Sequence, residues 1–585
     1  MAEEQPIGSI LLVDCGTVMT KATLLEQVAG QYRLVARGEA PTTVEYPWSD
    51  IAAGIRHAVD HISASTGRRF FEPSGDLIIP ELRGQQGIDA FAATVSASQP
   101  LQVVLAGLVR DLSVSSAERA AAGTYSTIKA ILANDGRDGG QSEGASVHTI
   151  HDAAPDVICI AGGVEGGAAE PVLSLVEAAT LASSLIEQST RPRLLFAGNS
   201  RLRQRVVQMV GKRAELSVAD NVRPTRTEEN LLSARAELDQ LYVQEKLERL
   251  PGFEAVSKWS AVAPKPTARA FGQLVQYLWR LGDSSKGILG IDVGAASTTV
   301  AAVFDGRLFT TIRGDLGVTF GGERMIQEHG AETVTRWLPE PVSADETRGM
   351  LINKVIRPTS IPQDVRELWL DQALAREAIR TTLELARPGW EPGAAQPYPH
   401  LLPLCDTIVV GGSVLAHTPR PGQAALTVLD ALEPIGVTTL VLDTHGLAPA
   451  LGIVAEVKPL AAVEVLDSGA FVNLATVVAP VGHARRGETI LRVHATYGEG
   501  KFSVEIGYGD LEVLPLPPGQ QAVLELRPLH NFDVGLGGPG KAGKLRVNGG
   551  LAGLIIDARG RPLHIPGNTE QRQSQMKQWL WDVGG

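Results

Sequence analysis

Cysteine is scarce in this 585-residue sequence, and no two cysteines stand at a spacing typical of metal binding. Cys15, Cys159 and Cys405 each lie alone in or beside an apolar run. A disulfide framework needs paired cysteines and a thiolate zinc site needs clustered ones, so the sequence argues against both. Few, isolated cysteines are typical of a reducing compartment, and we expect the protein to be cytoplasmic.

Long apolar runs and long basic runs are also missing. No apolar run reaches the roughly 18 residues that cross a bilayer, and the acidic start MAEEQPIGS has no signal-peptide core. We therefore expect no membrane association. The formal net charge is −12. Because nucleic-acid binding relies on clustered Lys and Arg, we also expect no nucleic-acid partner.

Two stretches of the sequence share one pattern. Each is an apolar run that ends on a carboxylate, turns through glycine and hydroxyl residues, and continues as a second apolar run. They are LLVDCGTVMTKATLLE at 11–26 and GILGIDVGAASTTVAAVF at 287–304. Each predicts a strand, a tight turn and a second strand, and each opens a region where strands and helices alternate, which is typical of α/β architecture.

A second pair of stretches supports a duplication. DTIVVGGSVLA at 406–416 has the pattern of DVICIAGGVEG at 156–166, in which an acidic residue precedes an apolar strand and paired glycines. Two matched pairs in the same order predict two diverged copies of one plan. From about residue 460 the sequence becomes short β-like runs between Gly and Pro turns, and it ends in a helical stretch, TEQRQSQMKQWLWD.

We therefore expect three domains: α/β domains over 1–285 and 286–459, and a mostly-β domain over 460–585. Four local predictions accompany them. We expect a helix that begins after Ser49 or Asp50, a helix over 113–132, a surface loop over the glycine-rich stretch 134–146, and a long helix over 227–249.

The two hairpin turns have the chemistry of phosphate cradles. Glycine lets the backbone approach a phosphate closely, and Thr or Ser hydroxyls add hydrogen-bond donors. A carboxylate at a strand end can hold Mg²⁺ directly or through water, because Mg²⁺ prefers oxygen ligands. We expect the first cradle to consist of Asp14, Gly16, Thr17, Thr20 and Lys21, and the second of Asp292, Gly294, Ser297 and Thr298.

Facing cradles on two domains would hold a nucleoside triphosphate from both sides. Asp14 and Asp292 are the predicted Mg²⁺ ligands, and with Lys21 they are the predicted catalytic residues. Catalysis would then consist of positioning and charge neutralisation. Closing and opening of the cleft around ATP would convert the chemistry into domain motion.

These motifs carry a resemblance to a known superfamily. VDCGTVMTK and IDVGAASTTV resemble the two phosphate motifs of the actin, sugar-kinase and heat-shock chaperone superfamily. VVGGSVLAHTP looks like its adenosine motif, with Gly411, Gly412 and Ser413 at the base. FGGERM at 320–325 is similar to the start of the helix that flanks the nucleotide in the chaperone branch, which implies Glu323 on the ribose side.

Within that superfamily the chain looks most like the glutamate mutase L (MutL-like) family. The stretches that carry this resemblance include APTTVE, GLVRDLSVSSAERAAAG and ICIAGGVEGG, and together they span nearly the whole chain. The resemblance implies two actin-like (ribonuclease-H-like) α/β domains around a nucleotide cleft, with ATP and Mg²⁺ as cofactors. It also implies a chaperone-like accessory of an adenosylcobalamin-dependent mutase, which assembles the enzyme or exchanges its damaged cobalamin.

The second hairpin departs from the family pattern. Ala295 stands where glycine is frequent, and Thr299 stands where a carboxylate is frequent. We therefore expect nucleotide binding with slow Mg²⁺-dependent hydrolysis, or with none.

Two alternatives remain open. One is a nucleotide-dependent, actin-like scaffold in which the β-rich tail mediates self-association. The other is a small-molecule kinase or a hydantoinase-type ATP-dependent enzyme; a kinase needs a further acid that the sequence does not identify. GLGGPGKAGK at 535–544 is not a P-loop, because no Ser or Thr follows its lysine and the next residues are strand-like.

Overall fold

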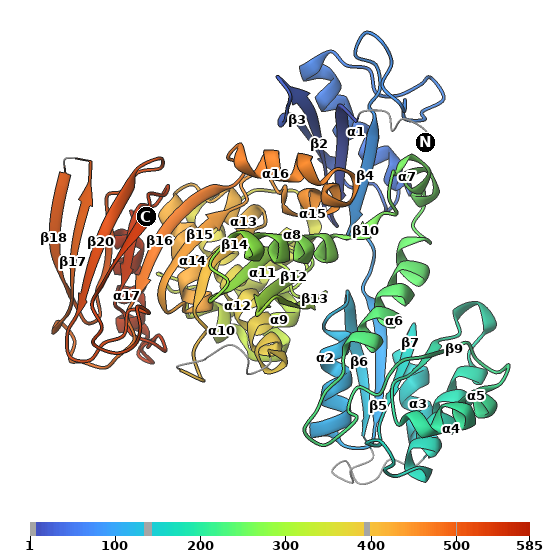
Figure 1. Ribbon diagram of the computed structural model, residues 1–585. Coiled ribbons are helices and arrows are strands. Elements are labelled where there is room, and N and C mark those ends of the chain that lie inside the picture. Colours follow the sequence, from blue (N-terminus) through green and yellow to red (C-terminus); the bar gives the residue numbers. More distant parts are fainter. Residues whose placement is uncertain (1–6, 134–142, 391–397, 499, 585) are drawn as a thin grey trace. The chain divides into compact units, whose positions relative to one another are not determined.

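The computed structural model describes residues 7–133, 143–390, 398–498 and 500–584. The chain forms two compact units. Unit 1 consists of Met1–Ala97, Ala255–Phe309 and Leu316–Gly585, and unit 2 consists of Ser98–Glu254 and Thr310–Asp315. Both units combine helices with sheets (Figure 1), so the predicted α/β class is confirmed.

The first sheet of unit 1 contains the first hairpin. Its strand order is β10-β4-β1-β2-β3. β1 is antiparallel to β2 and parallel to β4. The strands are β1 (Ser9–Cys15), β2 (Met19–Val28), β3 (Gln31–Pro41), β4 (Ala90–Val95) and β10 (Lys265–Pro266).

The second sheet of unit 1 has eight strands, in the order β13-β12-β11-β14-β15-β16-β22-β19. Its first five strands repeat the plan of the first sheet, because β11 is antiparallel to β12 and parallel to β14. The predicted duplication is therefore confirmed at the level of topology. The strands are β11 (Gly287–Val293), β12 (Thr298–Phe304), β13 (Arg307–Arg313), β14 (Cys405–Gly411), β15 (Gly436–Leu442), β16 (Val472–Ala479), β19 (Leu511–Leu514) and β22 (Leu554–Asp557).

One part of the duplication argument is wrong. The counterpart of β14 in the first sheet is β4, because β4 is parallel to β1 as β14 is parallel to β11. The stretch 156–166 instead forms β7 (Val157–Ala161) in unit 2. β7 and β14 are both strands of parallel pairs, and buried strands of this kind are apolar throughout, so the pattern alone could not distinguish the two sheets.

The C-terminal region is rich in β-structure, as predicted. Three of its strands extend the eight-stranded sheet, and the others form a four-stranded sheet in the order β18-β17-β20-β21. The eight-stranded sheet thus crosses the predicted limit at 459/460. Unit 2 combines Ser98–Glu254, from the predicted domain 1–285, with Thr310–Asp315, from the predicted domain 286–459. The strands of the smaller sheet are β17 (Thr489–Tyr497), β18 (Gly500–Gly507), β20 (Gln521–Pro528) and β21 (Gly543–Asn548). β21 begins at Gly543, within the glycine-rich stretch 535–544, so a strand stands where a P-loop requires a helix.

A single core connects the two large sheets of unit 1. Ile10 of β1 and Val303 of β12 belong to the same buried cluster as Phe271 of α8 and Leu451 of α15. Asp50 caps α1 as predicted, and its carboxylate accepts a hydrogen bond from the backbone N–H of Ala52. The helices are α1 (Ile51–Thr66), α8 (Thr267–Leu281), α9 (Gly322–His329), α10 (Ala331–Thr335), α11 (Ala344–Ile356), α12 (Val365–Ala386), α13 (Ser413–Ala416), α14 (Pro421–Leu432), α15 (Ala448–Val457), α16 (Pro459–Asp467) and α17 (Thr569–Asp582).

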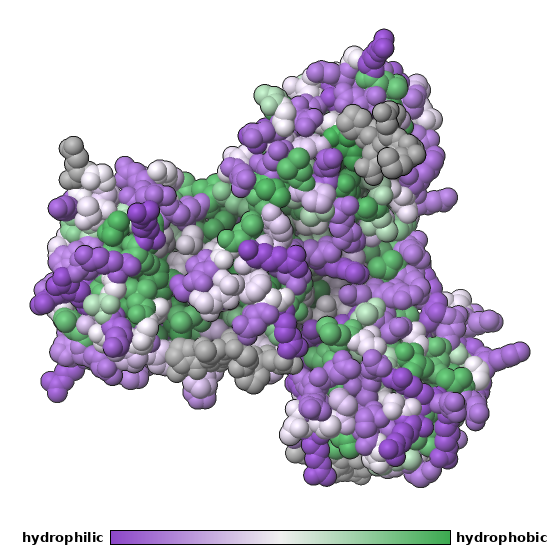
Figure 2. Space-filling model, viewed as in Figure 1, coloured by the Kyte–Doolittle hydropathy of each residue, from purple (hydrophilic) through white to green (hydrophobic). Residues whose placement is uncertain are grey.

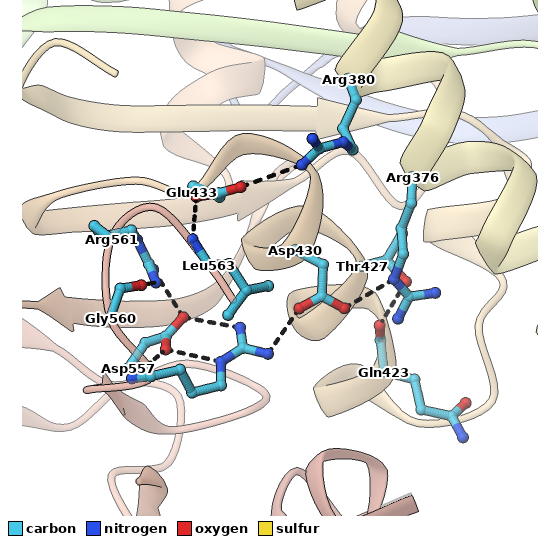
Figure 3. A network of polar contacts seen from close by, with 11 residues as sticks. Arg376, Arg380, Gln423, Thr427, Asp430, Glu433, Asp557, Gly560, Arg561 and Leu563 are labelled. Atoms are coloured by element: carbon cyan, nitrogen blue, oxygen red, sulfur yellow. Dashed lines mark hydrogen bonds and ion pairs between the residues drawn. The ribbon is translucent and has the colours of Figure 1, made fainter. Parts of the chain in front are cut away.

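A buried network of ion pairs connects the C-terminal region to α12 and α14 (Figure 3). The guanidinium of Arg559 bonds both carboxylate oxygens of Asp557 at 2.9 Å and one oxygen of Asp430 at 2.8 Å. Arg376 of α12 bonds the other oxygen of Asp430 at 2.9 Å. Arg561 completes the chain with a 2.8 Å bond to Asp557. Each of these side chains is at most 5% exposed, so the charges are satisfied by one another rather than by bulk solvent.

Unit 2 is an open parallel sheet with helices on both faces (Figure 1). Its order is β6-β5-β7-β8-β9, and every neighbouring pair is parallel. α3, α4 and α5 share a core with one face, and α2 contacts the strands and α6. Its elements are β5 (Leu101–Gly107), α2 (Ser115–Ala121), β6 (Ser126–Ala133), α3 (Glu143–Ala153), β7, α4 (Glu170–Leu185), β8 (Arg193–Phe196), α5 (Arg203–Val210), β9 (Leu216–Val218) and α6 (Leu232–Tyr242); α7 (Phe253–Trp259) follows.

Two helix predictions in unit 2 are corrected by the structure. The stretch 113–132 is helical only to Ala121, and its second half is β6. β-branched residues such as Thr127 and Ile128 fit a parallel strand, and pairing with β5 decides their conformation. The helix predicted over 227–249 begins later, at Leu232, and α6 ends at Tyr242, where a π-helical turn at Val243–Leu247 follows. Most of the loop predicted at 134–146 lies outside the described residues.

The surface view in Figure 2 shows hydrophilic residues interspersed with smaller groups of hydrophobic ones. Among the helices of the described residues, none is long and apolar enough to cross a membrane.

Candidate functional site

The first hairpin places Asp14 where three elements of unit 1 meet. Its Oδ1 atom accepts hydrogen bonds from the hydroxyls of Thr94 in β4, at 2.7 Å, and of Thr267 at the start of α8, at 2.8 Å. Lys21 is directly opposite Asp14 in the β1–β2 register. The turn is closed by a 3.0 Å bond from Gly16 N to Met19 O. The carboxylate is therefore held in one orientation by β4 and by the start of α8.

The second hairpin has the same turn as the first, and the backbone of the segment that follows β13 is hydrogen-bonded to this turn. Gly294 N donates to Ser297 O at 2.8 Å, as Gly16 does in the first turn. The N–H groups of Val318 and Thr319 donate to the carbonyls of Gly294 and Ala295 at 3.1 and 2.9 Å. The methyl group of Ala295, which departs from the family pattern, therefore belongs to a turn whose carbonyl groups are already paired.

The two hairpins bring their acidic residues close enough to interact. The pKa of Asp292 is raised from 3.8 to about 6, chiefly by burial; Lys21 opposes the rise, and the charges of Asp14 and Asp443 add to it. A β-carbon on Gly411 would lie 3.2 Å from Asp292 Oδ1 and 3.9 Å from the β-carbon of Asp443. The structure thus brings together Asp14, Lys21 and Asp292, which the sequence singled out, and adds a third carboxylate.

Asp443 is the site residue that the sequence reasoning missed. It follows β15, is 1% exposed, and accepts hydrogen bonds from the N–H groups of Leu447, at 2.9 Å, and Ala448, at 2.7 Å. It therefore caps α15, and burial raises its pKa. A β-carbon on Gly446 would lie 2.7 Å from Lys21 Nζ, so this loop also contacts the lysine. The signal was present in TTLVLDTHG, an apolar strand that ends on a carboxylate as β1 and β11 do.

Three predicted hydroxyl donors are used within the protein. Thr17 donates to the carbonyl of Ser96 at 3.1 Å, and Thr298 donates to the carbonyl of Leu316 at 2.7 Å. Thr20 pairs with the hydroxyl of Thr42 at 3.0 Å. Thr20 and Thr298 are fully buried. Their role toward phosphate stays a prediction, and in this conformation they support the turns instead.

The predicted adenosine motif adjoins the second hairpin. Gly412 has a φ of 99°, and a β-carbon there would lie 2.1 Å from the carbonyl oxygen of Val293. Only glycine fits this close approach. Ser413 begins α13 and is exposed, as is Glu323 in α9, whose carboxylate accepts a 3.4 Å bond from Gln327 of its own helix. Gly411 and Gly412 thus lie at the site, whereas no contact places Glu323 there.

Cys15 is a structural residue rather than a nucleophile. It is fully buried beside Asp14, and burial raises the pKa of its thiol well above the usual range. A thiol in this environment stays protonated at neutral pH and is a poor nucleophile.

The carboxylates suit a magnesium ion that keeps part of its water shell. Within the described ranges, no three His, Cys, Asp or Glu side chains are grouped as a metal site. Mg²⁺ in phosphate sites is commonly held by one or two carboxylates together with water and phosphate oxygens. Asp14, through its Oδ2 atom, and Asp292 are therefore the residues that would hold it.

Asp292 should make unliganded protein less stable as the pH rises. Because its folded pKa of about 6 lies above the ordinary 3.8, the folded state keeps this proton longer than the unfolded state between these values. The free energy of unfolding therefore falls between pH 4 and pH 7, by at most about 3 kcal/mol. We expect Asp292→Asn to raise the thermal unfolding midpoint at pH 8 by a few degrees and to leave it unchanged at pH 4.

Asp305→Asn is the matched control, because Asp305 is exposed in the turn between β12 and β13. Thermal unfolding is followed by circular dichroism at both pH values. Equal effects of Asp292→Asn at pH 4 and pH 8 would contradict the assignment of the raised pKa.

Comparison with known proteins gives one family and several distant structures. The sequence model described as MutL protein matches residues 10–469. Protein MutL of Clostridium tetanomorphum is 24% identical over 493 residues, which cover 79% of this chain and 98% of that protein.

The similar solved structures are distant. A nucleotide-free acetone carboxylase is 11% identical, with 86% of this chain and 81% of that chain covered and a TM-score of 0.32. The activator of the 2-hydroxyisocaproyl-CoA dehydratase from Clostridium difficile, with bound ADPNP, is 10% identical, with 79% and 96% covered and a TM-score of 0.28. Because both TM-scores are below 0.5, we base no conclusion on these structures.

Proposed function

The chain belongs to the MutL protein family, and on this basis we propose that it binds ATP with Mg²⁺ between its two hairpins. We further propose that it acts as a chaperone-like accessory protein of an adenosylcobalamin-dependent mutase of the glutamate mutase type. The observation that carries the nucleotide proposal is the interaction of Asp14, Lys21 and Asp292, which come from two duplicated sheets.

The residues have separate roles in this proposal. The two carboxylates hold the metal, which supplies charge neutralisation at the phosphates when it is bound. Lys21 adds a positive charge beside the same phosphates, and Asp443 positions the loop that contacts Lys21. Gly411 and Gly412 allow the backbone of the adenosine motif to lie against the second hairpin, and we propose that the nucleoside binds beside this motif.

Two helices connect this site to the core. Thr267, which bonds Asp14, is the first residue of α8, and Asp443 caps α15. α8 and α15 then pack together in the core shared by both sheets. A change in the charge bound at the carboxylates would therefore shift both helices, and this is how we propose that nucleotide exchange alters the surface that a client recognises.

Hydrolysis should be slow. Thr299 is directly opposite Asp292 in the β11–β12 register, so this position offers a hydroxyl where the family pattern frequently has a carboxylate. A hydroxyl is a weaker hydrogen-bond acceptor and a weaker base than a carboxylate, so it activates an attacking water less.

The accessory role is tested with a purified adenosylcobalamin-dependent glutamate mutase whose cofactor has been damaged by turnover. The protein, fresh adenosylcobalamin and MgATP are added, and recovery of mutase activity is measured. We expect recovery with ATP, little recovery with ADP, and none without the protein. Recovery that is independent of nucleotide would overturn the proposal. ATP-dependent light scattering without any effect on the mutase would favour the actin-like scaffold instead.

A further inference from the structure

Large apolar side chains are concentrated on the exposed surface of α11 and of the loop that follows it. Ile352, Val355 and Ile356 of α11 are between 46% and 68% exposed, and Ile361 in the loop is 72% exposed. We call these four residues the α11 patch. Isolated exposed apolar residues are ordinary on a protein surface, whereas a group of them on one element marks an interaction surface.

The patch follows one face of α11. Ile352 is three residues before Val355 and four before Ile356, the spacing that places side chains next to one another on a helix. The core side of the helix is formed by other residues, since Thr347 and Leu351 are buried. α11 is therefore apolar toward solvent as well as toward the core, and its solvent face has no partner among the described residues.

A cavity of about 310 Å³ lies beside the patch, and Ile356, Ile361 and Leu370 are among its lining residues. The charges of Lys354 and Asp371, which also line it, neutralise each other, because the ammonium lies 2.5 Å from the carboxylate. A cavity of roughly 150 Å³ already accommodates a benzene ring. This one therefore has room for a large apolar side chain from a partner.

The loop after α11 is held in place by its own hydrogen bonds. Ser360 N donates to Arg357 O at 2.9 Å, and the side-chain amide of Gln363 donates to Ile361 O at 2.8 Å. Gln363 N donates to the carboxylate of Glu367 at 2.7 Å, which engages the carboxylate of this cavity-lining residue. The wall of the cavity is thus ordered in advance, and a partner loses little free energy in ordering it.

Positive charge flanks the apolar face at both ends. Arg348 lies one helical turn before Ile352, and its ion pair with Asp345 is long, at 4.0 Å, and exposed. Arg357 follows the last residue of α11, lines the cavity and forms no ion pair with any residue that the structure describes. A segment with carboxylates beyond both ends of an apolar stretch would complement these charges.

We propose that the α11 patch and its cavity bind a helix of a partner protein, whose apolar side chain enters the cavity and whose carboxylates pair with Arg348 and Arg357. A small molecule that filled the cavity would leave Ile352 and Val355 exposed, because neither of them lines it. A helix with apolar residues three and four apart covers the whole face instead. This surface is separate from the carboxylates of the two hairpins and does not depend on nucleotide binding there.

The probe is a fluorescein-labelled synthetic helix with leucine at positions i, i+3, i+4 and i+7 and glutamate at both ends. Its binding to the full-length protein is measured by fluorescence anisotropy, beside that of a peptide with lysine in place of glutamate. We expect the glutamate peptide to bind more tightly, and Ile356→Ser to weaken its binding at least about tenfold, because a buried isoleucine contributes about 1.5–3 kcal/mol. Arg357→Glu should reduce or reverse the preference between the two peptides.

Leu185→Ser and Arg201→Glu are the controls. Leu185 is 64% exposed and is the last residue of α4, as Ile356 is of α11, and Arg201 is an exposed arginine of unit 2. Both controls should bind the glutamate peptide like the unmodified protein. All four variants should keep its thermal unfolding midpoint, since each residue is exposed.

Three results would overturn the proposal. The first is that the glutamate peptide does not bind at millimolar concentration, or binds Ile356→Ser as it binds Leu185→Ser. The second is binding of the apolar anion 8-anilinonaphthalene-1-sulfonate without binding of either peptide, which would assign the cavity to a small molecule. The third is a dimer in sedimentation experiments that Ile356→Ser dissociates, which would assign the face to a second copy of this chain.

Discussion

Asp14→Ala and Asp292→Ala should each weaken the binding of MgATP by at least about 100-fold, which corresponds to about 2.7 kcal/mol. Each change removes one of the two carboxylates that would hold the metal, and Mg²⁺ has no grouped set of protein ligands among the described residues to replace it. Asp14→Ala also leaves the hydroxyls of Thr94 and Thr267 without their acceptor. Isothermal titration calorimetry with MgATP, and with ATP plus a chelator, measures the loss.

The pH dependence of binding separates the two carboxylates. Protonation of Asp292 competes with the metal, so the affinity of the unmodified protein should fall as the pH drops below about 6. Asp292→Ala should lose this fall as well as most of the affinity. Asp467→Ala, at the exposed end of α16, is the control and should bind MgATP normally. Normal binding by both Asp14→Ala and Asp292→Ala would show that the nucleotide site is elsewhere.

Arg559→Ala should destabilise unit 1 by about 3–5 kcal/mol, the usual range for removing one partner of a buried ion pair. The guanidinium of Arg559 is 1% exposed and connects Asp557 to Asp430 (Figure 3). It also lies 4.4 Å from the ring centroid of Trp579 in α17. Although burial opposes ionisation, Arg559 and Arg561 hold the pKa of Asp557 below its usual range, and Arg559→Ala removes the larger of these two contributions. The substitution leaves Asp557 with Arg561 and Asp430 with Arg376 as their remaining ion-pair partners, and this loss of partners for buried carboxylates is the reason for the destabilisation.

Hydrogen–deuterium exchange and the thermal unfolding midpoint measure this effect. Exchange should rise in α14 and α17, which the network joins, and should stay unchanged in α4 of unit 2. Arg492→Ala is the control, because its ion pair with Glu505 is about half exposed and such pairs contribute at most about 1 kcal/mol. Equal destabilisation by Arg559→Ala and Arg492→Ala would contradict a structural role for the network.

The site could be predicted from sequence where chemistry is local. Residues 11–26 and 287–304 each show a strand that ends on a carboxylate and turns through glycine. In the structure, the first turn joins β1 to β2 and the second joins β11 to β12, at equivalent places in the two sheets. Asp443 has the same local signal, but no hairpin follows its strand, so the pattern did not group it with Asp14 and Asp292. Thr20 and Thr298 were predicted as phosphate donors, but their hydroxyls bond within the protein. The sequence pattern cannot tell whether a hydroxyl points to a ligand or into the protein.

Some properties follow from the order of residues alone. Apolar runs interrupted by glycine specify the hairpins, Asp50 specifies the start of α1, and the glycine-rich stretch 535–544 continues as a strand, because backbone preference and hydrogen-bond capping act over a few residues. Membership of the family also rests on the sequence.

Long-range pairing was decided by the tertiary structure. The sequence could not show that β4 rather than β7 is the partner of β1, that unit 2 is a separate parallel sheet, or that Arg559 connects two aspartates 127 residues apart, Asp430 and Asp557. The pKa of Asp292 likewise depends on burial and on charges from distant segments. One buried strand looks like another in sequence, and so does one charged residue. Only the packing of the folded chain decides which strands pair and which charges form ion pairs.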